Sequence, residues 1–147
     1  MVRDSAPRPP GGASFDFAVR VYFEDTDAAG VVYYANYLRF CERARTEWLR
    51  ALGYAQQRLA EEEATAFVVT SVTADYHRPA RLDDELLVRS HLATVRGASL
   101  VFAQNIHRKE ELIFESRITV ACVNTLRMRA APLPAALRTQ LLSYPQS

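Results

Sequence analysis

The chain has 147 residues, with 18 Lys and Arg against 17 Asp and Glu, which gives a formal net charge of +1 at pH 7. This length suits one domain with a core of its own. The near balance of charge excludes a global field that would attract nucleic acid or an anionic membrane. No apolar run reaches the roughly 18 residues that a transmembrane helix needs, so we expect no transmembrane segment.

The N-terminal segment and the two cysteines bear on location. Residues 1–13 contain several Pro, Gly and charged residues and lack the apolar stretch of an export signal. We therefore expect a disordered tail over residues 1–13, a single domain over residues 14–143 and a cytoplasmic location. Cys41 and Cys122 lie far apart in apolar patterns without CxxC spacing, so we expect both to be reduced, buried and unreactive.

In the first half of the domain, the spacing of apolar residues changes from the pattern of a strand to that of a helix. Alternating apolar and polar residues predict a half-buried strand over residues 15–23. After an acidic turn, the spacing predicts a helix of about 20 residues, or about 30 Å, from Val32 to Leu52, with Gly53 as its C-terminal stop. The expected buried stripe of this helix is Tyr37, Phe40, Cys41, Ala44 and Trp48. The expected ion pairs on its solvated side are Glu42 with Arg45 and Arg43 with Glu47.

The second half is dominated by strands. A short polar helix is expected over residues 54–63, and a short C-terminal helix over residues 135–142. The expected strands between them are residues 66–76, 85–95, 98–108 and 112–123. Short links at residues 96–97 and 109–111 predict antiparallel hairpins. One long helix among such strands must be buried against a curved antiparallel sheet, which is the α+β hotdog arrangement.

The turn before the long helix is the strongest chemical signal. It reads Phe23-Glu24-Asp25-Thr26-Asp27-Ala28-Ala29-Gly30 and so places two aspartates just ahead of the helix. Unpaired backbone N–H groups at a helix N-terminus, reinforced by the helix dipole, favour developing negative charge. A carboxylate beside them can act on a bound carbonyl group, so the pattern indicates acyl-transfer chemistry.

Other interpretations of this turn are open or weaker. Asp25 and Asp27 can be plain turn and capping residues. A calcium loop is disfavoured because Ala29 and Asn36 stand at the fifth and twelfth positions of an EF-hand, where oxygen ligands are required. A phosphatase-type nucleophile needs a buried parallel strand before it. The histidines lack metal-ligand spacing and the serines lack a nucleophile-elbow context, so neither a metal site nor a serine triad is predicted.

The stretch Val21 to Tyr37, VYFEDTDAAGVVYYANY, closely resembles the signature of hotdog-fold acyl-CoA thioesterases of the 4-hydroxybenzoyl-CoA thioesterase type. Residues 40–47, 78–84 and 96–102 resemble the branch of this family that is associated with the bacterial Tol-Pal envelope system. The resemblance covers about residues 15–142. It implies hydrolysis of an acyl-CoA thioester to a free acid and CoA, with neither a metal nor an organic cofactor.

The same resemblance implies roles for individual residues. Asp27 becomes the catalytic acid, either as base toward water or as nucleophile, and Asp25 falls outside that role. The backbone N–H of Tyr34 becomes the donor that polarises the thioester oxygen. Many Tol-Pal-type members have His at this position, whereas 4-hydroxybenzoyl-CoA thioesterases have Tyr. Because a phenol titrates near about pH 10, we expect the backbone of Tyr34 rather than its hydroxyl to contribute.

Substrate and partner expectations follow from the resemblance as well. The CoA phosphates are expected on Arg96, with Arg78 and Arg81 as weaker candidates. Edge-to-edge joining of hotdog sheets implies a homodimer or homotetramer with sites between chains. Acyl carrier protein is a further expected partner. Two alternatives are a hotdog hydratase or dehydratase, which commonly needs a His beside an acid, and a noncatalytic acyl-carrier or envelope-assembly partner.

Overall fold

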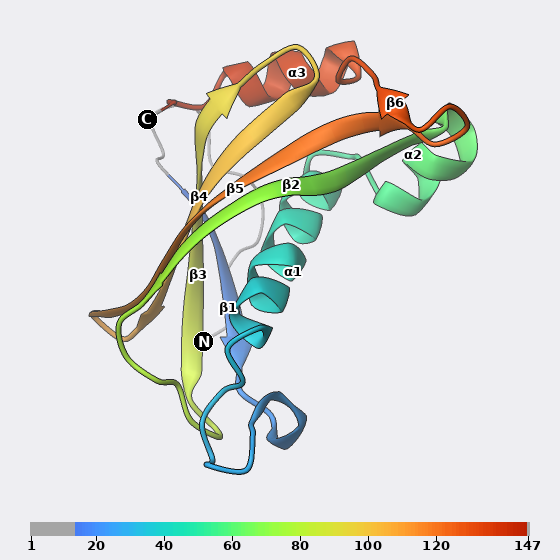
Figure 1. Ribbon diagram of the computed structural model, residues 1–147. Coiled ribbons are helices and arrows are strands. Elements are labelled where there is room, and N and C mark those ends of the chain that lie inside the picture. Colours follow the sequence, from blue (N-terminus) through green and yellow to red (C-terminus); the bar gives the residue numbers. More distant parts are fainter. Residues whose placement is uncertain (1–13, 147) are drawn as a thin grey trace.

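The structure is a computed structural model that describes residues 14–146, so the predicted tail over residues 1–13 lies outside the described residues. Within them, a curved antiparallel sheet wraps around one long helix, α1 (Figure 1). The α+β hotdog arrangement expected from the sequence is therefore confirmed. None of the helices in residues 14–146 has the length and apolarity that crossing a membrane requires.

The sheet has the strand order β1-β3-β4-β5-β2, and the short strand β6 pairs with β5. All neighbouring strands are antiparallel. The strands are Phe15–Arg20 (β1), Thr65–Tyr76 (β2), Glu85–Val95 (β3), Ser99–Arg108 (β4), Glu111–Asn124 (β5) and Arg129–Ala130 (β6). The predicted hairpins join β3 to β4 and β4 to β5. In this order β1 and β2 form the two edges of the sheet.

The helices are Asn36–Ala51 (α1), Gln56–Glu63 (α2) and Ala135–Leu142 (α3), with a 3₁₀ turn η1 at Phe23–Asp25. The predicted start of the long helix at Val32 is wrong, because the N–H of Val32 bonds to the carbonyl of Ala80 and that of Tyr33 to the carbonyl of Asp25. The predicted strand over residues 15–23 is too long at its end, because residues 23–25 form η1. The stop at Gly53 is confirmed, and its φ of +97° lies in the left-handed region that glycine adopts without steric cost.

The core lies between α1 and the inner face of the sheet. All five residues of the predicted stripe are buried, and the Trp48 ring stacks on Phe15 with 5.6 Å between centroids. Cys41 and Cys122 are buried free thiols, as expected, and burial raises the pKa of Cys41 to about 12.

The ion pairs predicted on the solvated side of α1 are wrong. Arg45 is buried, with 7% of its surface exposed, and its Nη1 donates to Oε1 of Gln104 at 2.8 Å. The reason is helical spacing, since position 45 is four residues after Cys41 and three before Trp48 and therefore shares their face. Glu47 pairs with Arg50 rather than with Arg43.

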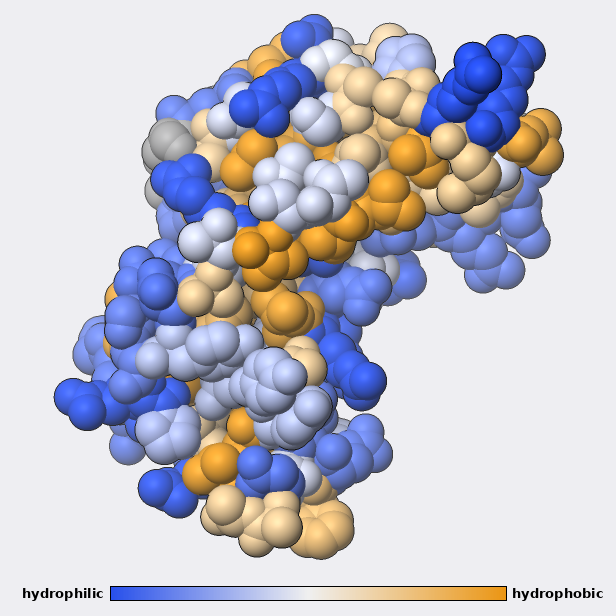
Figure 2. Space-filling model, in the orientation of Figure 1, coloured by the Kyte–Doolittle hydropathy of each residue, from blue (hydrophilic) through white to orange (hydrophobic). Residues whose placement is uncertain are grey.

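The helix covers the sheet unevenly. Contacts of α1 with the sheet are concentrated on β1 and β3, away from the edge strand β2. Val69, Val72 and Tyr76 of β2 pair across the sheet with the buried residues Val120, Ile118 and Phe114, so they face inward; nevertheless they are 48%, 41% and 45% exposed. Figure 2 shows a band of hydrophobic surface that follows the line of β2. The inner face of this edge is thus open.

Candidate active site

Asp27 lies in the loop between η1 and α1, where a tight turn fixes it. Its N–H donates to the carbonyl of Val31 at 2.9 Å, and its carbonyl accepts from the N–H of Gly30 at 3.0 Å. Its Oδ1 accepts from the N–H of Ala29 at 2.9 Å. Gly30 has φ +80°, a conformation that favours glycine. The turn therefore holds an exposed carboxylate at a defined place on the surface.

Asp25, two residues earlier, has the opposite environment. Only 3% of its surface is exposed. Its Oδ1 accepts from Nδ2 of Asn36 at 2.9 Å, its Oδ2 accepts from the N–H of Tyr22 at 2.8 Å, and its carbonyl accepts from the N–H of Tyr33 at 3.0 Å. Because Asn36 is the first residue of α1, Asp25 ties the end of the first strand segment and the loop to the start of the helix.

Tyr34 lies in the turn that immediately precedes α1. Its carbonyl accepts from the hydroxyl of Tyr76 at 3.0 Å, so a side chain of β2 holds this turn. Within residues 14–146 its backbone N–H makes no hydrogen bond, whereas those of Tyr33 and Asn36 are bonded to the carbonyls of Asp25 and Tyr33. The N–H of Tyr34 is therefore free to donate to a ligand oxygen.

A hollow of about 290 Å³ opens beside Tyr34. It is lined by Tyr34, Tyr37, Tyr76, His77 and Arg78, among others. Burial raises the pKa of the Tyr37 and Tyr76 phenols, so both keep their protons at neutral pH. The hollow offers space for part of a ligand next to the free N–H of Tyr34.

The three arginines considered for CoA lie at different ends of the sheet. Arg96 follows β3, at the opposite end of that strand from the Asp27 loop (Figure 1), and its carbonyl accepts from Nε of Arg138 at 3.3 Å. Arg78 lines the hollow beside Tyr34 and pairs with Glu111 at 3.1 Å. Arg81 forms an isolated β-bridge with Val31, next to the Asp27 turn. Within one chain, the structure brings Arg78 and Arg81, and not Arg96, to the end that carries Asp27.

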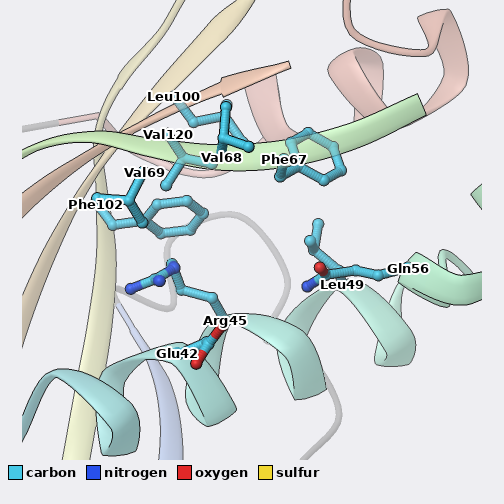
Figure 3. Close-up of a pocket in the computed structure, with 10 residues that line it drawn as sticks. All are labelled: Glu42, Arg45, Leu49, Gln56, Phe67, Val68, Val69, Leu100, Phe102 and Val120. Atoms are coloured by element: carbon cyan, nitrogen blue, oxygen red, sulfur yellow. The ribbon is translucent and has the colours of Figure 1, made fainter. Parts of the chain in front are cut away.

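A second pocket, of about 360 Å³, lies between α1 and β2 (Figure 3). Its wall is mostly apolar and includes Leu49, Phe67 and Phe102, together with the charged residues Glu42 and Arg45. Sequence reasoning missed this pocket because its residues come from separate elements. The one signal was the spacing that places Arg45 on the face of Cys41. In residues 14–146 no group of three or more His, Cys, Asp or Glu is arranged to hold a metal ion.

Residues 21–141 match the sequence pattern of the thioesterase-like superfamily. The chain belongs to this superfamily. It is 46% identical over 124 residues to the acyl-CoA thioesterase YbgC of Haemophilus influenzae, a match that covers 84% of this chain and 91% of that relative. The prediction of a hotdog-fold thioesterase is thereby confirmed.

Solved structures agree with this thioesterase fold. A probable thioesterase from Bartonella henselae superposes with a TM-score of 0.79 at 36% identity, covering 83% of this chain and 100% of that one. The 1,4-dihydroxy-2-naphthoyl-CoA thioesterase Slr0204 from Synechocystis superposes with a TM-score of 0.81 at 26% identity, covering 88% of this chain and 96% of that one. The association with the Tol-Pal system is not addressed by these relatives and stays a prediction.

Proposed function

We propose that this thioesterase hydrolyses an acyl-CoA thioester to a free carboxylic acid and CoA, with Asp27 as its catalytic carboxylate. One observation carries the proposal. The loop before α1 holds both an exposed carboxylate, fixed by a turn, and an unbonded backbone N–H at Tyr34. The relatives named as acyl-CoA thioesterases support the substrate class.

The chemistry follows from these two groups. The thioester oxygen accepts from the N–H of Tyr34, and this donor with the dipole of α1 stabilises the developing oxyanion, by about 3–4 kcal/mol for one well-placed donor. Asp27 then acts in one of two ways. As base it takes a proton from the water that attacks the carbonyl carbon; as nucleophile it forms a mixed anhydride that water opens. In both routes the carbon–sulfur bond breaks and CoA leaves as the thiol.

A homodimer through β2 completes the proposed site. This strand has 12 residues and, within the described chain, hydrogen-bonds only to β5 along its length, so its outer edge is a template for pairing. Antiparallel pairing of two β2 strands about a two-fold axis continues the sheet and inverts the partner. The partner's Arg96 then lies at the end of the assembly that carries Asp27, where it can contact the CoA phosphates beside Arg78 and Arg81. Pairing of two dimers gives the expected tetramer, and acyl carrier protein is an alternative thioester donor.

The proposal is tested by thiol release from acyl-CoA. Asp27→Asn keeps the size of the side chain and should lower kcat by at least about 100-fold without loss of the fold. The matched control is Glu24→Gln, which removes an exposed charge from the neighbouring 3₁₀ turn and should retain turnover. Near-normal turnover by Asp27→Asn would remove Asp27 from the catalytic role. Hydration of an enoyl thioester without thiol release would favour a hydratase, and thioester binding without turnover a noncatalytic partner.

A further inference from the structure

Three hollows follow one another along the seam between α1 and β2. The first, beside Tyr34, includes Tyr76 of β2. The second, of about 200 Å³, includes Leu38, Arg39, Glu42 and Arg45 of α1 together with Val69 and Val72 of β2. The third is the pocket of Figure 3, which shares Glu42, Arg45 and Val69 with the second. From the first hollow to the third, the residue numbers rise along α1 and fall along β2, so the hollows lie in one line that starts at the candidate active site. We call this line of hollows the groove.

Arg45 is the unusual residue in this groove. It is 7% exposed yet lines the second and third hollows, and Figure 3 shows its guanidinium in the space between α1 and β2. Only Nη1 is hydrogen-bonded within the described residues, to Gln104. None of the ion pairs between described side chains includes Arg45. A buried cation without an ion-pair partner in contact with it is costly, so the site suits an anion that supplies one.

The remaining wall fixes what kind of anion fits. Leu49, Phe67, Leu100 and Phe102 give the third hollow an apolar lining, which suits a hydrocarbon chain. Glu42 also lines the hollow, but its side chain is exposed, so water screens its charge more than that of Arg45. The guanidinium nitrogens that make no hydrogen bond can donate to both oxygens of a carboxylate.

Building on the proposed thioesterase activity, we infer that the groove binds an acyl chain that ends in a carboxylate, and that Arg45 pairs with this carboxylate. The substrate class is then a CoA thioester of a dicarboxylic acid. At a helical rise of 1.5 Å per residue, Arg45 lies about 14 Å along α1 from its first residue, Asn36, which follows the turn that contains Tyr34. With carbon–carbon bonds of about 1.5 Å in a zigzag, a chain of roughly twelve carbons covers that distance.

The test compares dodecanedioyl-CoA with dodecanoyl-CoA, which differ only at the far end of the chain. In the wild type we expect the higher kcat/KM for the dicarboxylic substrate. Arg45→Met should lower the ratio of the two specificity constants by about 10- to 100-fold, the effect of losing a charge-assisted hydrogen bond. Arg45→Lys keeps the positive charge, so it should keep part of the preference for dodecanedioyl-CoA over dodecanoyl-CoA. Arg43→Met is the matched control, because Arg43 is an exposed arginine on the same helix that lines none of the three hollows, and it should change the ratio much less.

A second measurement does not depend on any variant folding. Free dodecanedioate should inhibit the wild type at least about tenfold more strongly than dodecanoate, because only the diacid offers a carboxylate to Arg45. Equal inhibition, or an equal loss on both thioesters in Arg45→Met, would overturn the inference in favour of a structural role. Dissociation of the oligomer in Arg45→Met with an unchanged ratio would overturn it in favour of a partner contact. If dodecanoyl-CoA is hydrolysed but the ratio never changes, only this inference fails; if no acyl-CoA is hydrolysed, the proposed function itself fails.

Discussion

Asp25 and Asp27 are separated by one residue, yet the backbone gives them different tasks. The carboxylate of Asp27 is exposed and bonded to one N–H of its own turn, whereas that of Asp25 is buried against Asn36 and Tyr22. Removal of a buried acceptor that binds two donors lowers the free energy of unfolding, because both donors lose their partner. The environment of Asp25 therefore suits a residue that holds the loop in place for Asp27.

We expect Asp25→Asn to destabilise the protein, because the new amide places a donor against Asn36 or Tyr22. The expected loss is about 1–3 kcal/mol, or a fall of several degrees in Tm, together with a lower kcat. The double variant Asp25→Asn/Asn36→Asp should recover much of the lost Tm and of the lost kcat. In this variant the amide nitrogen at position 25 can donate to the carboxylate at position 36, while the amide oxygen still accepts from the N–H of Tyr22. Thermal unfolding and thiol release measure the two effects. An unaffected Tm in the single variant, or no recovery in the double variant, would contradict this account.

The start of helix α1 is set by the hydrogen bonds of the turn that precedes it. Residues 33–35 form a turn that is tied to Asp25 and to Tyr76, and the helix proper begins at Asn36. This geometry leaves the N–H of Tyr34 unbonded just ahead of the first helical turn, where the helix dipole is strongest. Tyr34 is 63% exposed, and its ring packs on that of Tyr33.

Tyr34→Phe should therefore retain most of the activity, while Tyr34→Pro should nearly abolish it by removing the backbone N–H. Ala35→Pro is the control for damage to the helix start, because Ala35 has φ −71°, which a proline ring accepts, and the variant keeps the N–H of Tyr34. We expect kcat to fall much further in Tyr34→Pro than in Ala35→Pro. A loss above about 100-fold in Tyr34→Phe would instead assign a role to the hydroxyl.

The open edge of β2 matters at the scale of the whole molecule. A long edge strand with Val68, Val69 and Val72 exposed is a pairing surface in a chain of this size. We expect Val72→Lys to shift the protein toward the monomer in light scattering after gel filtration. Leu142→Lys is the matched control, since Leu142 on α3 is also 41% exposed. A monomeric wild type, or a Val72→Lys variant that stays dimeric, would argue against this interface.

Arg96 gives the sharpest test of a shared site. Arg96→Ala should raise KM for acyl-CoA several-fold with little change in kcat, and should barely affect a short thioester that lacks the nucleotide. Mixing the Asp27→Asn and Arg96→Ala variants then tests the geometry. If Asp27 and the partner's Arg96 share one site, each mixed dimer contains one intact site, and activity with a normal KM returns. Failure to recover in exchanged dimers would place Arg96 outside the site.

The sequence by itself determined the features that depend on neighbours along the chain. The spacing of Tyr37, Phe40, Cys41, Ala44 and Trp48 predicts the buried face of α1, because helical periodicity is local. The link between residues 96 and 97 predicts the β3–β4 hairpin for the same reason. Asp27 and Tyr34 are close in sequence, so a motif of short range identifies both, and the loop keeps them together.

Only the tertiary structure decided the features that depend on distant partners. Hydrogen bonds of Val32 to Ala80 and of Tyr33 to Asp25 delay the start of α1, although the local pattern extends the helix to Val32. Arg45 is buried because Gln104, 59 residues away in sequence, accepts its hydrogen bond beneath the helix. Arg96 lies far from Asp27 because β3 separates the two ends of the sheet. Periodicity and motifs carry no information on such pairings, since these arise only when elements pack against one another.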